Sequence, residues 1–317
     1  MLLLIEHLIW VLIVFVFLLF ALFIRNFFTL RNLHYILYMA SLLGLLVFAQ
    51  SITLLSGNMD LSISQNAGLS AILVGVIMVD WLPMLPGWTG IILILIIGGL
   101  LGAFNGFFVG KLKINPFLVT LSTYLMFNWL TYFIRKGAII DIPPALLFLG
   151  GGKIGELYIA IFVLIALCIF LYFVLDHTRF GSYIRAVGGN TDAAGMLGIK
   201  TGKIKFWVFT IGGILAGGAG LIYIGYLKTI PSTIAEGDVL FLAFAGSIIG
   251  GVSMSGGRGS IIGALGGIIL IALIQAGTTM TAMDPTLRGF LNGLILLIAI
   301  LINKSREMLR DKLLMSG

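Results

Sequence analysis

The sequence predicts an all-α polytopic membrane protein with about ten transmembrane helices in one bundle. The 317 residues are 60% hydrophobic and 10% charged, with a mean hydropathy of +1.16. Soluble domains carry about 25% charged residues, so a chain this apolar can hide its surface only in lipid. Apolar runs also recur along the chain, each close to the roughly 20 residues that a spanning helix needs. Both observations favour one membrane domain over residues 1–317.

Ten apolar stretches are expected to span the membrane. Their approximate limits are 8–24, 33–56, 65–82, 88–110, 115–134, 157–176, 204–226, 238–254, 259–278 and 286–302. The stretch 238–254 is short and rich in Gly and Ser, which favours a broken or re-entrant helix, and the junction 56–66 is similarly irregular. The N-terminal run lacks a basic start and a small-x-small cleavage site, so it is interpreted as a retained first span.

Glycines recur at intervals of four within several of these stretches. Lipid provides little hydrophobic drive between helices, so small-xxx-small faces stabilise helix pairs by letting the backbones approach closely. This spacing predicts tight helix crossings and carries no information about a substrate. The members are Gly98, Gly102, Gly106 and Gly110; Gly213 and Gly217; Gly246 and Gly250; and Gly259, Gly263 and Gly267.

The distribution of basic residues sets the expected orientation, because cytoplasmic loops carry an excess of Lys and Arg. With both termini in the cytoplasm, twelve basic residues lie inside and seven outside. Those inside are Lys111, Lys113, Arg179, Arg185, Lys200, Lys203, Lys205, Arg258, Lys304, Arg306, Arg310 and Lys312. Those outside are Arg25, Arg31, Arg135, Lys136, Lys153, Lys228 and Arg288. We therefore expect a multi-pass protein of the cell (inner or plasma) membrane with cytoplasmic termini.

The longest polar break in the chain covers residues 177–205. This break contains several basic residues and only one acidic residue, Asp192. The net charge of +7 is attributed to such loops rather than to nucleic-acid binding. Inside the break lies a short helical pattern, for which Asn190 or Thr191 is the expected N-cap and Gly198 the C-terminal stop. A small helix on a cytoplasmic loop between two long spans has a shape that can bind another protein.

Polar side chains inside the apolar spans are candidates for function, because burying them in a membrane is costly. Asn and Gln offer paired donors and acceptors that suit the hydroxyls of a neutral polar solute. For each of them a structural bond between helices is an equally good explanation, and Asp60 has the alternative of binding backbone amides at a helix start. The candidates for a substrate path are Asn58, Asp60, Asn66, Asn105 and Asn128, and Gln50, Gln65 and Gln275 are further polar residues at membrane depth.

Several kinds of chemistry are not expected. The chain has no Ser/His/Asp set, no paired carboxylates at a plausible site and no metal-ligand spacing, so neither a catalytic site nor a metal site is predicted. The segment 251–260 resembles a phosphate loop only faintly, because Gly257 and Arg258 stand where the motif requires Lys. A tight cytoplasmic turn is the better interpretation, and the chain is expected to bind no nucleotide. The single cysteine, Cys168, is interpreted as a core-filling residue.

The longest outer segment covers residues 135–156. Pro143, Pro144 and the three glycines at 150–152 exclude a continuous helix through it. Two hypotheses remain open for this segment: a surface on which a partner docks, or a plain connector.

Six segments, taken in order, carry a resemblance to a known family. They are Asn26–Leu33, Gly57–Ser62, Gly102–Gly106, Leu112–Thr123, Arg185–Asn190 with Ala193, Ala194, Gly198 and Ile199, and Gly250–Gly259. Together they resemble the permease subunits of ribose/xylose-type ABC importers, in the branched-chain amino-acid/ribose permease superfamily. The family usually has Gly-Gly-Ile-Asp-Leu-Ser where this chain has Asn58 and Met59, and a Ser-Leu-Ala-Gly-Gly turn where it has Met254 and Ser255. These departures leave the exact sugar open.

The resemblance implies a set of partners. The permease pairs with a second copy or a sister permease and receives a monosaccharide, such as ribose, xylose, arabinose or glucose, from an extracytoplasmic sugar-binding protein. ATP and Mg²⁺ bind to separate cytoplasmic ABC ATPase subunits, so the chain itself holds no cofactor and is not an enzyme. The lipid bilayer is the remaining partner, and nucleic acid is not one.

Within this scheme we interpret the break at 177–205 as the coupling loop. The coupling helix is expected to dock in a groove of the ATPase, with apolar contact from Met196 and Leu197. Its residues are Thr191, Asp192, Ala193, Ala194, Gly195, Met196, Leu197 and Gly198. Arg185, Lys200 and Lys203 have two open roles: pairing with acids on that partner, or binding lipid phosphates and setting topology.

Other functions are kept as alternatives. Nucleoside and branched-chain amino-acid permeases are relatives of the same superfamily. A gradient-driven carrier working alone is a rival of another class, although the scarcity of charge within the spans argues against proton coupling. A scaffold protein is disfavoured by the many polar residues at membrane depth.

Overall fold

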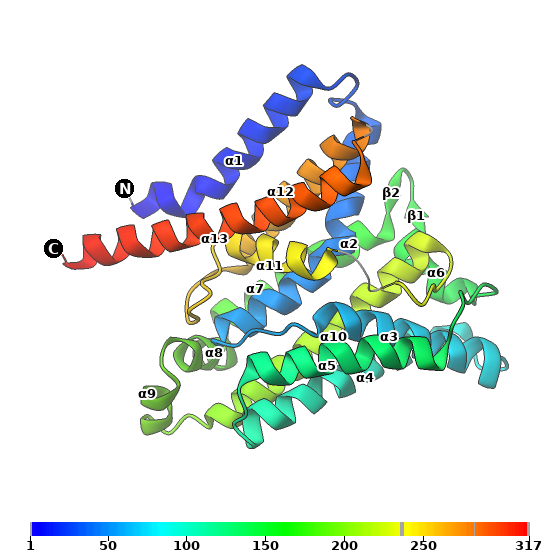
Figure 1. Ribbon diagram of the computed structural model, residues 1–317, viewed down its shortest axis with the longest axis horizontal. Helices are drawn as coiled ribbons and strands as arrows, with labels where there is room; N and C mark the ends of the chain where they lie inside the picture. Colours follow the sequence, from blue (N-terminus) through cyan, green and yellow to red (C-terminus); the bar gives the residue numbers. More distant parts are fainter. Residues whose placement is uncertain (1, 235–237, 282, 316–317) are drawn as a thin grey trace.

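The computed structural model describes residues 2–234, 238–281 and 283–315 and is almost entirely helical (Figure 1). The helices are α1 (Leu2–Phe23), α2 (Leu30–Leu55), α3 (Ile63–Gly75), α4 (Gly87–Gly106), α5 (Pro116–Ile134), α6 (Pro144–Gly151), α7 (Ile159–His177), α8 (Arg179–Gly189), α9 (Thr191–Met196), α10 (Thr201–Leu227), α11 (Val239–Ile249), α12 (Ile261–Met280) and α13 (Pro285–Met315). Single π-helical turns, η1 (Val76–Trp81) and η2 (Phe107–Lys111), extend α3 and α4. A small antiparallel hairpin joins β1 (Lys153–Ile154) to β2 (Leu157–Tyr158).

The expected polytopic all-α fold is confirmed. Seven helices of the described chain are long and apolar enough to cross a membrane, and three shorter apolar helices, Ile9–Phe23, Val239–Ile249 and Thr286–Leu301, fall within the other predicted spans. The stretch predicted to be broken is the shortest of them: α11 has 11 residues. At 1.5 Å per residue it covers about 16 Å, roughly half of the hydrocarbon core.

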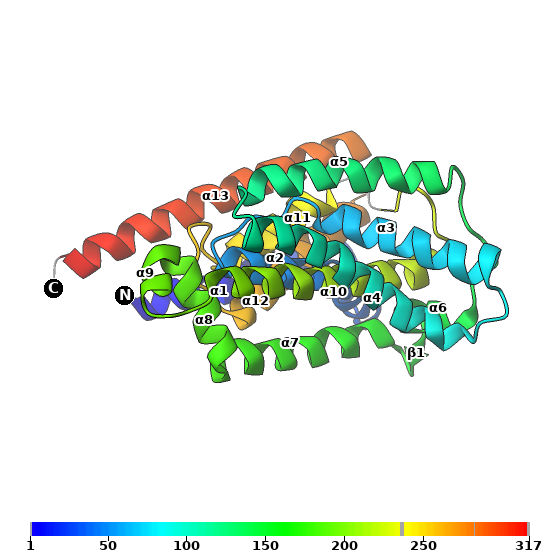
Figure 2. The same cartoon turned by 90° about the horizontal axis from the view of Figure 1, so that it is seen from below.

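Two helices, α2 and α10, form the centre of the bundle (Figure 2). Every side chain from Ala40 to Ser56 is buried, which is the pattern of a helix surrounded by protein on all sides. The helices around them keep outward apolar faces, which are suited to lipid. Exposed members of these faces are Leu100 on α4, Phe133 on α5, and Ile169 and Phe173 on α7.

The glycines of α4 meet α10 in a close seam, as their spacing predicts. A Cβ atom on Gly98, Gly102 or Gly110 would collide with the backbone oxygen of Gly213, Phe209 or Gly202, respectively. The backbones therefore approach to a distance that only glycine permits.

The second predicted glycine face joins α11 to α12, with one correction. Gly250 packs against Gly263, and Gly267 packs against Gly246. Gly259 lies outside the helix in the preceding loop, with a φ of +139°, and faces Val252. Its place in the spacing therefore reflects a turn rather than a helix contact.

The outer segment 135–156 is more ordered than a plain connector. Pro144 is the first residue of α6, and the helix ends at Gly151, so the prolines and glycines bound a short helix within a segment that has no continuous one. The hydroxyl of Tyr38 on α2 donates to the Gly150 oxygen at 2.7 Å, and the Tyr38 ring stacks on Tyr158 with centroids 3.7 Å apart. The segment thus packs into the bundle, and docking of a partner on it remains a prediction.

Both ends of the chain approach the same end of the bundle. In Figure 1 the start of α1, the end of α13 and the helices α8 and α9 all lie on the left, opposite the β1–β2 hairpin. The loop after η2 and the loop between α11 and α12 lie at that end as well. We call it the α9 end.

Replacing Gly102 by Ala should lower the free energy of unfolding by about 1–3 kcal/mol, the usual cost of overpacking. The new Cβ would meet the Phe209 oxygen and lie 2.9 Å from the Gly213 Cα, and neither backbone can move away cheaply. Gly293→Ala on α13 is the matched control, because nothing lies within 4 Å of its new Cβ. The measurement is thermal unfolding of the purified protein in detergent. Equal midpoints for the two variants would contradict the close α4–α10 seam.

Candidate functional site

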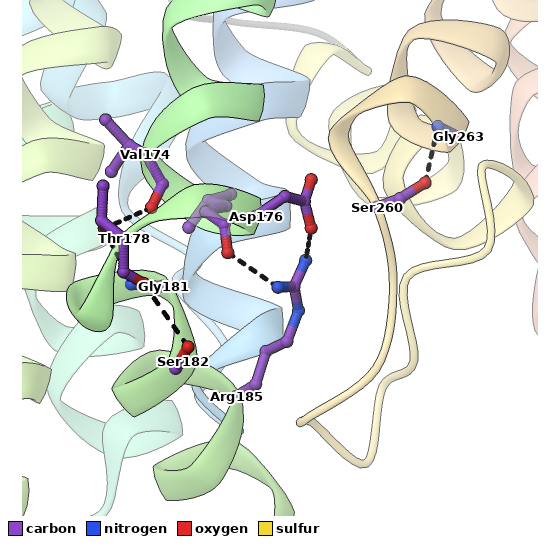
Figure 3. A network of polar contacts seen from close by, with 9 residues as sticks. Val174, Asp176, Thr178, Gly181, Ser182, Arg185, Ser260 and Gly263 are labelled. Carbon is purple, nitrogen blue, oxygen red and sulfur yellow. Dashed lines mark hydrogen bonds and ion pairs between the residues drawn. The ribbon is translucent and has the colours of Figure 1, made fainter.

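The candidate site lies at the α9 end, and its first part is the corner between α7 and α8 (Figure 3). α7 ends at His177, and Thr178 begins α8 by accepting a hydrogen bond from the Gly181 amide at 3.4 Å. The hydroxyl of Thr178 also donates to the Val174 carbonyl at 2.6 Å. A threonine that bonds to both helices fixes the angle of the corner.

Arg185 has partners within the chain, which neither hypothesis for this residue anticipated. Its guanidinium forms an ion pair with Asp176 and donates to the Leu175 oxygen at 2.7 Å (Figure 3). Both groups belong to the last turn of α7, so Arg185 braces α8 against α7. Lys200 and Lys203, by contrast, are exposed at the start of α10.

The short helix α9 follows α8. Its hydrogen bonds show which of the two residues, Asn190 or Thr191, is the N-cap. The Asn190 side chain accepts from the amides of Asp192 at 3.0 Å and Ala193 at 2.9 Å, so Asn190 is the N-cap. Thr191 instead donates its hydroxyl to the Val187 oxygen at 2.9 Å, which joins α9 to α8. Gly198 takes a φ of +83° and ends the turn, as predicted.

The predicted coupling residues divide into a fixed side and a free side. Ala194 is buried at 3% exposure, so it anchors the helix rather than offering a contact. Gly195 has open space around it. Met196 and Leu197 are 88% and 81% exposed, although both are apolar. We call these two residues the apolar tip; Leu197 lies at the C-cap, one residue beyond α9.

Two clefts adjoin this helix. One of about 730 Å³ is lined by Val109, Gly110, Lys113, Ile114, Asn115, Pro116, Thr191, Asp192, Gly195, Met196, Thr201, Gly202 and Lys205. The other, of about 580 Å³, is lined by Phe107, Gly110, Lys111, Ile199, Lys200, Thr201, Gly202, Lys203 and Phe206. Five lysines and one aspartate line the two clefts, which makes this surface basic.

Glycines from three distant segments meet behind α9. The amide of Gly257 donates to the Leu55 oxygen at 2.9 Å, and a Cβ on Gly256 would lie 2.7 Å from the Gly57 Cα. Gly188, at the end of α8, lies between them, and its Cβ would collide with the Leu55 oxygen. We call Gly57, Gly188, Gly256 and Gly257 the glycine junction.

Sequence reasoning missed this junction. It correctly interpreted the segment with Gly256 and Gly257 as a tight turn, in which the Ser253 amide bonds to the Arg258 oxygen at 2.9 Å. The available signal was a glycine in each of three polar breaks. Gly57, Gly256 and Gly257 all have positive φ, which favours glycine independently of packing.

Beyond the junction, the chain between α2 and α3 is not helical. Residues 56–62 run back along the bundle before α3 begins (Figure 1). Asp60 accepts from the Ser62 amide at 2.9 Å and from its hydroxyl at 2.7 Å. Asp60 therefore binds one backbone amide and one hydroxyl at the start of α3, close to the structural alternative predicted for it.

The same segment is tied to two other helices. Asn105 on α4 donates its amide nitrogen to the hydroxyl oxygen of Ser62 at 2.7 Å. Thr120 on α5 donates to the Met59 carbonyl at 3.2 Å. Non-helical backbone at membrane depth persists only where protein or a cavity surrounds it, and these bonds supply part of that surrounding.

The remaining path candidates have different surroundings. Asn58 donates within its own segment, to the oxygens of Ser56 at 2.9 and 2.7 Å. Asn66 donates to the Gly98 carbonyl at 3.1 Å, a bond between helices α3 and α4. Asn128 is half-buried on α5, two turns or about 12 Å beyond Thr120. The structure thus brings Asp60 and Asn105 together at Ser62, whereas Asn58 bonds to Ser56 in the same segment and Asn128 lies apart.

A bundle of apolar helices that encloses polar side chains, with a short capped helix outside it, is the architecture of a polytopic membrane protein. The chain belongs to the family described as branched-chain amino acid transport system / permease component, whose profile matches residues 32–300. No solved structure matches the chain.

Similar proteins with curated names are import permeases. The ribose import permease protein RbsC of Escherichia coli (strain K12) is 27% identical over 288 residues, 89% of this chain and 88% of its own length. RbsC of Bacillus subtilis (strain 168) is 30% identical over 268 residues, covering 83% of this chain and 82% of its own. The fructose import permease protein FrcC of Rhizobium meliloti is 29% identical over 288 residues, 88% of this chain and 79% of its own.

Removing the cap of α9 should loosen that helix without unfolding the bundle. Asn190→Ala loses two accepted hydrogen bonds, and N-cap losses cost about 0.5–2 kcal/mol, so amide hydrogen exchange of residues 192–197 should accelerate about 2- to 30-fold. Asn190→Asp keeps an acceptor at the same place and should retain the protection. Identical exchange in the Ala variant and the original protein would contradict the cap.

Proposed function

We propose that this chain is the membrane-spanning permease subunit of an ATP-driven importer for a monosaccharide. The observation that carries the proposal is the exposed apolar tip, Met196 and Leu197, on a capped helix at the basic end of a bundle that contains no nucleotide motif. Such a tip is suited to a partner that supplies the energy.

The substrate class is supported by the relatives and by the polar groups of the chain. The relatives quoted above carry the names of ribose and fructose import permeases. Around Ser62 the chain offers amide and hydroxyl groups, which pair with neutral hydroxyls, and the carboxylate of Asp60 is bonded to Ser62 itself. A monosaccharide therefore fits this site better than a branched-chain amino acid, whose charged ends require charged partners.

The energy source in this proposal is a separate ATPase, which binds ATP and Mg²⁺ and also binds α9 of the permease. The apolar tip enters a groove of the ATPase, as apolar anchors do at the centre of protein interfaces. The lysines around the two clefts, Lys113 and Lys205 among them, fit an acidic rim on that partner.

Movement of α9 has a direct mechanical route to the polar segment. α9 follows α8 immediately, and Gly188 of α8 touches Leu55 and Gly257 through the glycine junction. Gly57 in turn belongs to the segment that carries Asn58 and Asp60. In this proposal the ATPase docks at one end of this connection and the solute binds at the other. A partner shifts the permease between two conformations if it binds one of them more tightly than the other.

The proposal includes the other partners and the orientation. The α9 end faces the cytoplasm, with both termini, and a second permease copy or a sister permease completes the path. An extracytoplasmic sugar-binding protein delivers solute to the opposite end.

Reconstitution in vesicles tests the proposal. The permease, its cognate ATPase and its binding protein should together accumulate radiolabelled D-ribose or D-fructose when ATP is present, and the permease alone should not. Accumulation by the lone permease, sensitive to ionophores, would establish the rival carrier.

Introducing negative charge at the apolar tip should weaken the binding of the ATPase to the permease. The double variant Met196→Glu with Leu197→Glu should weaken ATPase binding at least about tenfold, because a buried anchor becomes charged. Met84→Glu is the matched control, an exposed methionine in the loop before α4 at the other end of the bundle. Co-purification with the tagged permease measures the affinity, and ATPase binding at the original strength by the double variant would refute docking at this tip. Ala194 is unsuitable for this test because it is buried.

A methyl group in the glycine junction should uncouple hydrolysis from uptake. Gly188→Ala would drive Cβ into the Leu55 oxygen and to 2.6 Å from the Gly257 amide, whereas Gly189→Ala meets nothing within 4 Å. We expect sugar transported per ATP hydrolysed to fall about fivefold or more in the first variant and to stay unchanged in the second. ATPase binding should persist in both. Equal ratios for the two variants would count against the junction as the route.

A further inference from the structure

Unpaired polar atoms gather in one part of the bundle. Among the described residues, six buried side-chain nitrogen or oxygen atoms have no hydrogen-bond partner in the protein. Five of them belong to four side chains, each at most 2% exposed: Gln50, Asn58, Ser64 and Asn105. We call these four residues the amide cluster. The sixth atom is Nε of Arg288, at the start of α13.

The members of the amide cluster surround the break between α2 and α3. Asn58 lies in the break, and Ser64 lies in the first turn of α3. Asn105 is held there by its bond to Ser62, which leaves its own Oδ1 unpaired. Gln50 is five residues before the end of α2, about 8 Å along the helix axis. Discontinuous helices of this kind hold solute sites in many transporters.

Gln50 differs from the neighbouring polar residues because its side-chain amide has no hydrogen-bond partner. On the same helix, Ser51, Thr53 and Ser56 donate their hydroxyls to backbone oxygens at 2.7, 2.9 and 2.8 Å. Gln50 pairs neither Nε2 nor Oε1 and is 0% exposed. An unpaired amide in an apolar interior destabilises the fold, so an apolar residue would serve better here if packing were its only role.

A small cavity lies against Ser64 of the amide cluster. It measures about 10 Å³ and is lined by Leu46, Ser64, Ala67, Gly68, Gly220, Tyr223, Ile234 and Val239. A space of that size holds about one water molecule and is far too small for a monosaccharide. The site is therefore closed in this conformation, and the segment 56–62, which carries Asn58, is the part of its surroundings that lies outside regular helix.

We propose that Gln50, Asn58, Ser64 and Asn105 form a binding site for the hydroxyl groups of a neutral polyhydroxylated solute, which opens when the segment 56–62 moves. This inference rests on the proposed function and assigns the solute contacts to particular atoms. Amide oxygens accept from sugar hydroxyls, the Gln50 Nε2 donates to a sugar oxygen, and the Ser64 hydroxyl does either.

The test combines two measurements on the variants Gln50→Met and Ser64→Ala. Both changes remove unpaired polar atoms, so thermal unfolding of the permease in detergent should occur at a higher temperature, or at an equal one for Ser64→Ala. In the reconstituted importer, kcat/KM for uptake of D-ribose or D-fructose should fall at least about fivefold for Gln50→Met, the effect of one lost hydrogen bond to the solute. Gln275→Met is the matched control, a half-buried glutamine on α12 away from the cluster, and should leave uptake unchanged.

The outcomes separate this inference from the proposed function. If the original importer is active and both variants take up sugar with unchanged kcat/KM, the amide cluster is no solute site. If both variants also unfold at lower temperature, the cluster is a structural network bridged by water. If the original permease with ATPase and binding protein transports none of the sugars, the proposed function itself fails, and the site fails with it.

Discussion

The interruption between α2 and α3 is the constraint on which the rest of the structure depends. A membrane interior provides no water to pair backbone groups, so seven non-helical residues within a bundle need protein around them. Asn105, Thr120 and the glycine junction provide it from α4, α5, α8 and the turn after α11. Elements that are distant in sequence are thereby bound to one short segment.

The close backbone contacts follow from the same requirement. Where Gly98 and Gly102 meet α10, and where Gly188 meets Leu55, backbone lies against backbone. Contacts of backbone against backbone have no flexible side chain to absorb a displacement, so they transmit it. The stiff parts of the molecule are thus the two glycine contacts.

The sequence predicted where most of the helices begin and end. It did not predict which neighbours the side chains of each helix would meet. Apolar runs predicted the seven long spanning helices to within about three residues, whereas α11 ends five residues before its predicted limit. Gly198 was predicted as the end of the turn after α9, and the N-cap was left open between Asn190 and Thr191. The same reasoning left structural and solute roles open for Asn66, and only the structure shows its bond to the Gly98 carbonyl on a neighbouring helix. It also left Arg185 without its partner, because the fold of the corner brings Asp176 back against α8.

The glycine junction shows why such details are hidden. Gly57, Gly256 and Gly257 each have a local explanation as turn residues with positive φ, whereas Gly188 belongs to the last turn of α8. Their meeting depends on how three breaks stack at the end of the bundle. Burial of Gln50 was predictable from its apolar surroundings, whereas its lack of partners depends on every helix around it.

The brace between Arg185 and Asp176 has a consequence for the role of the surrounding lipid. It joins α8 to the last turn of α7, and α7 lies at the periphery with Ile169 and Phe173 turned outward. A tilt of the corner must therefore displace a helix that presses on acyl chains. The stiffness and lateral pressure of the bilayer thus become part of the mechanical load on this protein.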